Sequence, residues 1–409
     1  MNRDRLSRKW KGDTTKKQRL KSFGGLTFFK DFWNSSINAD YSVGSPIGTF
    51  TRSAASDICT YVNSDGVIQS ASGTALPRYQ GGYYDATGFH TQSGLMIEAT
   101  ATNLVPKSQV FNDAVWTASV LMTVGDNETS SPDGTVNAGI LASGDVNSTL
   151  ILTTSVTART FSVWLKRSAG TGNVDITANG GTGWTTVTLS SSDWRRFQVT
   201  AASALQTCGI RLVTSGDEVY IWGAQFETSP YATSYIPTTS AAATRNAESL
   251  TYAIVGNRTA ATESIFIKFA PESTFANDGV GRVLLSSDTK NRQFAKVAGG
   301  TVVQFKPNST DSGTSLSDAT TIPTANTSYV VTGIAYGATA ATNSRIYMDG
   351  VSENFDITDY ISPAWGTNFY IGSSNSGTTQ LNGIIQSIAM FSDAKDATTV
   401  STITNILNS

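Results

Sequence analysis

The chain has 409 residues, which is too long for one ordinary β-sandwich and predicts two or three domains. Only 15% of its residues are charged and 36 are Gly, a composition typical of short strands joined by tight turns that argues against a helical bundle. Two cysteines, Cys59 and Cys208, are too few for a disulfide framework. We expect both to be free thiols in a protein made in a reducing compartment.

The positive charge is concentrated at the N-terminus. Residues 1–21 hold nine Lys or Arg against two Asp, so this segment carries +7 and, because the whole chain carries −2, the remainder carries −9. We predict that residues 1–22 form a basic arm that stays disordered until it finds a partner. No apolar run reaches the length of a signal peptide or a membrane span, so we expect a soluble chain without a secretory signal.

Three interpretations of the basic arm remain open. It is a solvated tail, a segment that docks on another subunit of an assembly, or a nucleic-acid contact, which the lack of interleaved aromatic residues disfavours. The docking candidates are Arg3, Arg5, Arg8, Lys9, Trp10 and Lys11.

Residues 23–104 predict a small β-rich module. The run TYVNSDGVIQSA over residues 60–71 predicts two strands around a turn, because Asp-Gly supplies the left-handed backbone that a hairpin needs. In the closing run SGLMIEATATNLVP, Leu95 and Ile97 fall on one side of a strand.

Residues 105–240 predict a first sandwich of the jelly-roll type. Phe161, Val163 and Leu165 alternate with Ser162, Trp164 and Lys166, as in a half-buried strand, and further strand-like runs follow at intervals that suit an antiparallel sheet. Residues 229–245 contain Pro230, Pro237 and a run of small residues, which predicts a linker.

Residues 246–409 predict a second sandwich. Seven strand-like runs are separated by Gly, Asn, Asp and Thr clusters, which favours a jelly roll or a concanavalin A-like sandwich: SIFIKF, RVLLSS, TVVQFK, SYVVTGIAY, SRIYMDG, NFYIGSS and GIIQSIAMFS. The final residues predict a short helix with Asp396 as N-cap and Val400 and Ile403 on one face. The predicted class is therefore all-β, with two antiparallel sandwiches in tandem behind the arm and the small module.

Three phrases resemble a module of bacteriophage tail and head-fibre proteins: TRSAASDICTYVNSDGVIQSASGTALPRY, SGLMIEATATNLVPKS and WGAQFETSPYATSYIPTT. The resemblance covers residues 50–245 and implies that the first sandwich is similar to a carbohydrate-binding module. The chain departs from the family at Ile58-Cys59 and at Ala99–Ala101, where small residues and a charged Glu-Ala-Arg are usual.

The C-terminal sandwich resembles laminin-G and concanavalin A-like lectin domains. The resemblance rests on RIYMDG at residues 345–350, YIGS at 370–373 and LNGII at 381–385. These phrases report the fold more than a ligand, since their glycines serve turn geometry. The family resemblance implies a domain that binds glycans, proteins or nothing, depending on its loops.

The sequence offers no complete catalytic constellation. His90 is the only histidine, and the local run GFHTQSG contains neither a nucleophile elbow nor an aligned acid. Glycoside hydrolysis needs two facing carboxylates, whereas Glu98, Glu227, Glu263 and Asp349 stand singly. We predict that the chain is not an enzyme.

Two loops approach a calcium-binding pattern. They are NSDG at residues 63–66 and TFANDGVG at 274–281, and neither has the spacing of a known calcium loop. We interpret both as turns and predict no metal or cofactor.

Aromatic residues next to amides in loops are the best candidates for a glycan site, because sugar rings stack on aromatic faces and hydroxyls bond to amides. The candidates are Trp365, Tyr360, Tyr370 and Asn368 in DYISPAWGTNFY, and Trp184 in a Gly-rich stretch. Each of these aromatic residues has a competing interpretation as a core or inter-strand side chain.

These observations predict a structural virion protein, a tail or head fibre or spike. It would dock to other virion proteins through residues 1–22, assemble in the bacterial cytoplasm as a homo-oligomer, a trimer by analogy with phage fibres, and recognise host-surface polysaccharide. The alternatives are a capsid decoration protein without glycan binding and a polysaccharide depolymerase. We expect neither a membrane span nor a nucleic-acid partner.

Overall fold

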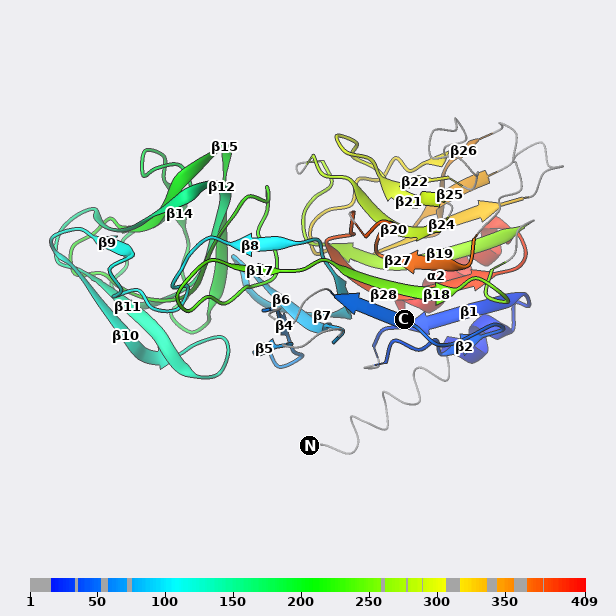
Figure 1. The fold of residues 1–409 in the computed structure, drawn as a ribbon, viewed down its shortest axis with the longest axis horizontal. Coiled ribbons are helices and arrows are strands. Elements are labelled where there is room, and N and C mark those ends of the chain that lie inside the picture. Colours follow the sequence, from blue (N-terminus) through cyan, green and yellow to red (C-terminus); the bar gives the residue numbers. More distant parts are fainter. Residues whose placement is uncertain are drawn as a thin grey trace. The chain divides into compact units, whose positions relative to one another are not determined.

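The computed structural model describes residues 16–33, 36–52, 58–71, 76–258, 262–276, 279–288, 290–306, 317–336, 344–356, 366–377 and 379–409 (Figure 1). Its regular structure consists of antiparallel sheets, the helix α2 (Ala397–Asn408) and a short helical stretch at residues 16–21. The predicted all-β class is confirmed.

The chain divides into two compact units that are interleaved in sequence. Unit 1 contains Met1–Arg52, Ser93–Ala99 and Ala247–Ser409, and unit 2 contains Ser53–Gln92 and Thr100–Asn246. The segment 23–104, expected as a module of its own, is shared between them. Its first strands complete the sheets of unit 1 by hydrogen bonding, whereas its middle part packs within unit 2.

Unit 1 is a sandwich of two antiparallel sheets. The first sheet has the order β2-β1-β28-β19-β24-β25-β26. Its strands are β1 (Leu26–Asp31), β2 (Tyr41–Ser42), β19 (Glu263–Pro271), β24 (Tyr329–Ala335), β25 (Ser344–Met348), β26 (Val351–Asp356) and β28 (Gly383–Phe391). The last residues of β7 (Gly88–Ile97) pair with β28 on this sheet.

The second sheet of unit 1 has the order β23-β22-β21-β20-β27-β18-β3. Its strands are β3 (Thr49–Arg52), β18 (Glu248–Ala253), β20 (Arg282–Ser287), β21 (Lys290–Lys296), β22 (Gln304–Phe305), β23 (Ser317–Asp318) and β27 (Asn368–Ile371). Between the sheets, the Phe28 ring packs edge to face against Tyr252 and Phe369, with ring centroids 4.9 Å and 5.4 Å apart. This aromatic cluster joins the two layers.

The opposite face of the first sheet is covered by α2 and by residues 16–21. Along β1, Phe28 points between the sheets and Phe29 points to the other side, as the two-residue period of a strand requires. Phe29 and Leu20 are both 0% exposed and belong to one apolar cluster with residues of α2. The prediction of a disordered arm is therefore wrong for residues 16–22. Burial of the apolar Leu20 side chain stabilises the ordered form of this segment.

Helix α2 begins as the sequence predicts. The Asp396 carboxylate accepts a hydrogen bond from the Thr399 backbone N–H at 2.8 Å, and Val400, Ile403 and Ile406 are buried on one face. In the described part of the chain, no helix has both the length and the apolar character that crossing a membrane requires.

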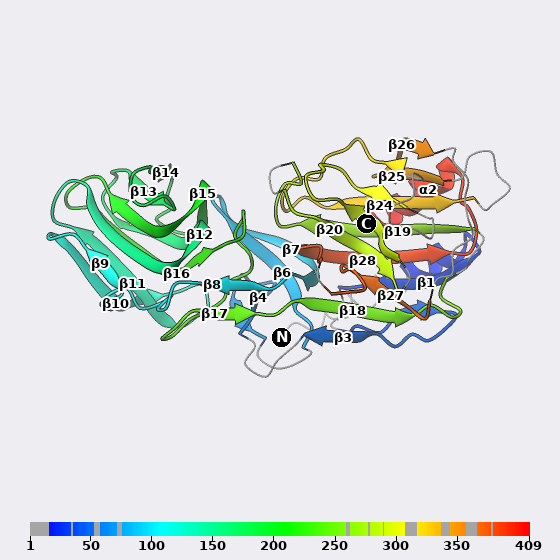
Figure 2. The ribbon, with the colours of Figure 1, turned by 45° about the horizontal axis from the view of Figure 1, so that its top comes forward.

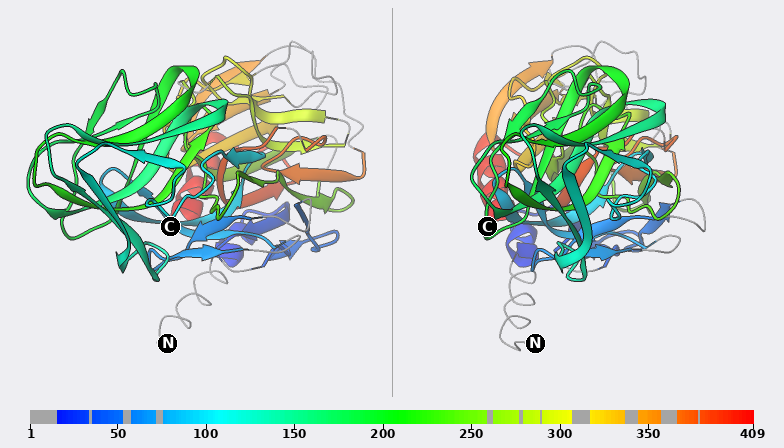
Figure 3. Two further views of the ribbon diagram at one scale, coloured as in Figure 1. Left: turned by 60° about the vertical axis from the view of Figure 1, so that its left-hand side comes forward. Right: turned by 90° about the vertical axis from the view of Figure 1, so that its left-hand side faces the viewer.

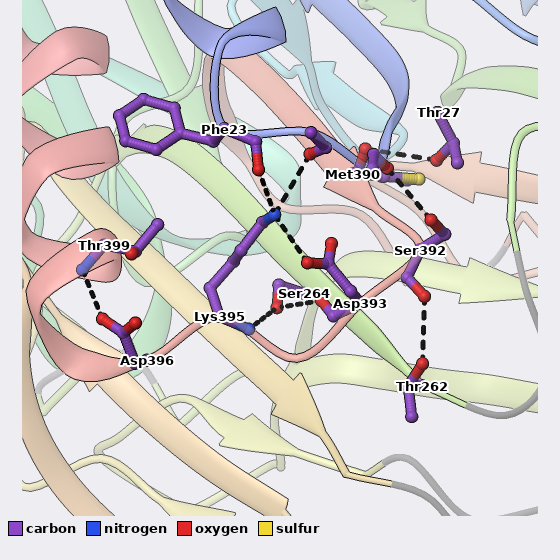
Figure 4. A network of polar contacts seen from close by, with 12 residues as sticks. Phe23, Thr27, Thr262, Ser264, Met390, Ser392, Asp393, Lys395, Asp396 and Thr399 are labelled. Carbon is purple, nitrogen blue, oxygen red and sulfur yellow. Dashed lines mark hydrogen bonds and ion pairs between the residues drawn. The ribbon is translucent and has the colours of Figure 1, made fainter.

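A polar network ties the N-terminal segment to the connection between β28 and α2 (Figure 4). The Lys395 ammonium donates to the backbone carbonyls of Phe23 at 2.9 Å and Gly24 at 3.1 Å. It also pairs with Asp393 at 2.7 Å. These contacts satisfy a largely buried charge, so residues 23 and 24 are held as part of unit 1.

Unit 2 is built on a strongly curved antiparallel sheet with the order β10-β11-β16-β12-β15-β13-β14, and β9 pairs with β12. Its strands are β9 (Trp116–Ala118), β10 (Met122–Ser130), β11 (Val136–Ser143), β12 (Ser148–Ala169), β13 (Val174–Thr177), β14 (Thr185–Val187), β15 (Arg195–Leu212) and β16 (Glu218–Glu227). Register shifts between Thr153 and Thr160 mark the bend of β12, and Figures 2 and 3 show the curved green strands.

The two faces of this sheet bury different residues. Phe161, Val163 and Leu165 are 0% exposed and lie in the main core, which confirms the predicted alternation. On the opposite face, Trp164 and Trp222 pack with apolar residues of a hairpin made of β4 (Thr60–Val62) and β5 (Ile68–Ser70). β6 (Tyr79–Asp85) follows this hairpin, and a short ladder joins β8 (Ala101–Asn103) to β17 (Ala243–Arg245).

The segment 229–245 is packed and is not a free linker. Tyr231, Tyr235 and Ile236 are 6%, 3% and 0% exposed, and the end of the segment forms β17. The prolines interrupt regular hydrogen bonding, but they do not prevent the aromatic and apolar side chains between them from being buried.

We expect Leu20→Ala to lower the free energy of unfolding by about 2–4 kcal/mol, because truncating a fully buried leucine leaves a cavity. Gln18→Ala changes an exposed residue of the same helical stretch and should cost less than about 0.5 kcal/mol. Urea denaturation followed by tryptophan fluorescence measures both. Equal stability of the two variants would contradict the packing of residues 16–22 in unit 1.

Candidate functional site

The predicted glycan-binding residues are only partly within the described chain. Asn368 and Tyr370 are described in unit 1, and Trp184 is described in unit 2. Tyr360 and Trp365 lie outside the described residues, as do the docking candidates Arg3, Arg5, Arg8, Lys9, Trp10 and Lys11.

Asn368 and Tyr370 meet at the carboxylate of Asp288. Asp288 follows β20, and β20 pairs with β27, which begins at Asn368. Asp288 Oδ2 accepts hydrogen bonds from the backbone N–H groups of Thr367 at 2.8 Å and Asn368 at 2.7 Å, and from the Thr367 hydroxyl at 2.6 Å. The Tyr370 hydroxyl donates to Oδ1 at 2.8 Å. We call these residues, with Asn375, the Asp288 cluster.

The hydrogen bonds of the cluster determine the charge state of its carboxyl group. Partial burial raises the pKa of Asp288, but the donors on Thr367, Asn368 and Tyr370 outweigh it and lower the pKa below its ordinary value of 3.8. Burial and the facing carboxylate raise the pKa of Tyr370, so its hydroxyl keeps its proton at neutral pH and donates. Asp288 is thus an ionised acceptor that positions its neighbours.

The cluster is open to solvent. Thr367 is exposed, and Asn368, Tyr370 and Asn375 are half-buried. Asn375 is fixed by a hydrogen bond from its amide to the Asp288 carbonyl at 2.8 Å. A hydroxyl, two amides and a phenol ring thus share one surface, a combination suited to hydrogen bonding with a polyol and to stacking on a sugar ring.

Trp184 belongs to a separate candidate in unit 2, on the loop between β13 and β14. The loop is braced by the Gly183 N–H, which donates to Asn179 Oδ1 at 2.7 Å. The Arg211 guanidinium lies over the half-buried Trp184 ring, 4.6 Å from its centroid, and pairs with Asp175 at 2.6 Å. One face of the indole is therefore occupied by a cation, which limits stacking by a ligand to the other face.

His90 lies in β7, close to the turn that joins β6 to β7. Its Nε2 contacts both Asp85 Oδ1 at 3.0 Å and the Thr87 hydroxyl at 2.8 Å, and Tyr83 stacks on the ring at 5.0 Å. A catalytic triad needs the acid and the nucleophile on opposite ring nitrogens. Because both partners meet the same nitrogen, this arrangement fastens the turn.

The single carboxylates have structural partners. Glu263 pairs with Arg258 at 2.6 Å, both nearly unexposed, and the Asp349 carboxylate accepts from the Val330 N–H at 2.8 Å. Glu227 is 1% exposed, and burial raises its pKa although Thr233 and Gln225 donate to it.

Glu98 is 0% exposed. Each of the four carboxylates named in the sequence analysis is therefore either buried or hydrogen-bonded within a turn. Asp349 is the exposed one of the four, whereas Glu98, Glu227 and Glu263 are buried.

The first predicted calcium-like loop is a turn. Asn63 Oδ1 accepts from the backbone N–H groups of Asp65 and Val67, each at 2.9 Å, and Gly66 has a φ of 82°. In the second loop, residues 277 and 278 lie outside the described chain. Across the described ranges, no group of three or more His, Cys, Asp or Glu side chains is arranged to hold a metal ion.

The sequence did not point to Asp288 or Thr367. Asp288 lies 80 residues from Asn368, and only the pairing of β20 with β27 brings them together. Thr367 could have been found from the sequence, because it lies between the selected residues Trp365 and Asn368.

We expect Asp288→Asn to destabilise unit 1 by about 1 kcal/mol at neutral pH, a value reduced for solvent exposure. Because the folded-state pKa lies below 3.8, ionised Asp288 stabilises the fold above that pH and loses this effect as the pH falls through the folded pKa. The difference between the wild type and the variant should therefore shrink in acid.

Urea denaturation at neutral pH and below pH 3.8 tests this expectation. Asp65→Asn, at an exposed turn residue, is the control and should differ from the wild type by less than about 0.5 kcal/mol at both pH values. A pH-independent effect of Asp288→Asn would show that its charge plays no part.

Comparison with known proteins identifies no family. No protein-family model matches the chain, and no curated protein matches it. Solved structures give partial likenesses at low identity. Domain 4 of AbnA, an extracellular arabinanase from Geobacillus stearothermophilus solved with arabinotriose, has a TM-score of 0.28 and 11% identity, covering 39% of this chain and 73% of that one.

Botulinum neurotoxin type C, whose cell entry depends on interaction with two ganglioside molecules, gives a likeness with a TM-score of 0.30 and 15% identity that covers 40% of each chain. The NanB sialidase from Streptococcus pneumoniae has a TM-score of 0.29 and 13% identity, with 37% of this chain covered. This chain spans less than half of the toxin and 26% of the sialidase. Likenesses of this extent assign no function to the chain.

Proposed function

We propose that this chain is a structural protein of a bacteriophage particle, a tail or head fibre or spike, that recognises host-surface glycans. The fibre-like phrases over residues 50–245 and the two all-β units support the proposal. In this function the N-terminal basic residues dock on other virion proteins, and the two units are displayed outward as a homo-oligomer, which by analogy with phage fibres is a trimer.

The Asp288 cluster is the observation that carries glycan recognition. Its ionised carboxylate accepts five hydrogen bonds from Thr367, Asn368 and Tyr370, so the positions of these groups are fixed before a ligand arrives. A ligand that meets prearranged groups loses less conformational entropy on the protein side. The remaining amide and hydroxyl groups match the donors and acceptors of sugar hydroxyls.

We expect the full chain to bind glycans from the host surface saturably on an array. Asn368→Ala and Tyr370→Ala should each weaken binding about tenfold, since each removes a hydrogen bond or a stacking surface from the cluster. Tyr83→Ala is the matched control, because Tyr83 is a half-buried tyrosine beside His90 and outside the cluster.

Three results would contradict this function. Binding that is unchanged in both cluster variants would place recognition elsewhere. Absence of any glycan binding would favour a decoration protein. Release of reducing ends from envelope polysaccharide would favour a depolymerase.

We expect deletion of residues 1–15 to leave a protein with unchanged thermal stability that no longer enters phage particles. The deletion stops before the helical stretch at 16–21, so Leu20 keeps its packing. Immunoblotting of purified particles measures incorporation. Replacing Arg3, Arg5 and Arg8 with Ser separates the effect of charge from that of length, and normal incorporation of the deletion would contradict docking through this segment.

A further inference from the structure

The outer face of the unit 2 sheet carries two neighbouring rows of side chains. The first row contains Trp164 of β12 and Trp222 of β16, which are paired in register and covered by the β4–β5 hairpin. Two residues further along the same strands, Lys166 pairs in register with Tyr220. Because strand residues alternate with a period of two, both rows lie on the same face.

The second row is only partly covered, with Trp194 packed against the edge of the Trp164 and Trp222 cluster. It contains Tyr220 of β16, Lys166 of β12, Ile140 of β11, which is paired with Tyr220, and Trp194 immediately before β15. Each of these four side chains is half-buried. The strands β11, β16, β12 and β15 are adjacent in that order in the sheet, so the row crosses it from strand to strand (Figure 2). We call it the Lys166 row.

Lys166 lies between two aromatic rings. Its ammonium is 5.3 Å from the centroid of Trp194 and 5.4 Å from that of Tyr220. The Trp194 indole N–H donates to the Ser130 carbonyl at 3.0 Å, which holds its ring in place. Cation–π contacts on both sides fix the ammonium without neutralising it.

No carboxylate neutralises this cation within the described ranges. In the part of the chain that the structure describes, no Asp or Glu oxygen lies within 4.0 Å of Lys166 Nζ. Glu218, two residues before Tyr220 on β16, instead accepts from the Ser168 hydroxyl at 3.2 Å. By contrast, Arg167 and Arg211 of the same unit pair with Asp217 and Asp175.

We propose that the Lys166 row is a second glycan site, one that selects polysaccharides bearing carboxylates. The Lys166 ammonium binds the carboxylate of a uronic or other acidic sugar, and the ring faces of Trp194 and Tyr220 that Lys166 does not occupy stack on the neighbouring pyranose rings. Two strand spacings separate the rings by about 10 Å, a span that linked sugar units cover. This inference rests on the proposed glycan-binding function and adds its ligand class.

The test uses the full chain and oligosaccharides of hyaluronan, alginate and colominic acid, each compared with its carboxyl-reduced form by calorimetry. We expect at least one acidic form to bind about tenfold or more tightly than its reduced form, and its binding to weaken with rising ionic strength. Lys166→Gln should remove this preference, and Lys166→Arg should keep most of it.

Lys107→Gln is the matched control, because Lys107 is a surface lysine of the same unit that pairs with Asp113 at 3.1 Å. It should leave the preference unchanged, and thermal melts should show that all three lysine variants are folded. Equal binding of the acidic and reduced forms, or a preference that survives Lys166→Gln, would overturn the proposal.

The variants also separate this inference from the proposed site in unit 1. Loss of the carboxylate preference in Lys166→Gln but not in Asn368→Ala supports the Lys166 row even if the Asp288 cluster binds nothing. Array binding that depends on Asn368 while no acidic form is preferred supports the Asp288 cluster and overturns the Lys166 row.

Discussion

The covering of both faces of each sheet is the constraint on which the rest of the structure depends. A strand presents alternate side chains to opposite faces of its sheet, so a core on one face buries only half of the side chains. In unit 2 the core takes Phe161, Val163 and Leu165, and the β4–β5 hairpin covers the tryptophans on the other face. Where that cover ends, the same strands carry side chains that tolerate water, and Lys166 is the next residue on this face after Trp164 of β12.

Unit 1 meets the same constraint with a second sheet and a helix. Phe28 and Phe29 are consecutive, yet one packs between the sheets and the other against the cluster that includes α2. Because both faces are covered, charged groups inside are paired, as in the fully buried Arg52–Glu248 bridge at 3.1 Å. Removing one member of such a pair is strongly destabilising, so these buried charges stabilise the fold. The polar groups that a ligand can reach lie at the ends of the strands.

The sequence predicts what depends on local periodicity. The alternation in β12 and the N-cap at Asp396 follow from spacing alone, and the structure has both. The interleaving of the units could not be predicted, because β1 and β3 find their partners hundreds of positions away along the chain. Asn368 and Tyr370 were selected as residue types in a loop, whereas Asp288, which holds them, is apparent only from strand pairing.

Both candidate sites lie on half-exposed surface, and this determines how they can be used. A hydrogen bond at such a surface contributes only about 0.5–1.5 kcal/mol, while association itself costs several kcal/mol, so each site alone binds weakly. A polysaccharide, however, repeats its recognition unit, and tethered sites raise avidity by roughly 10²–10⁴-fold when geometry lets them engage together. In the proposed particle, multiple copies therefore supply the strength that no single Asp288 cluster or Lys166 row has, while each contact remains weak enough to release and rebind.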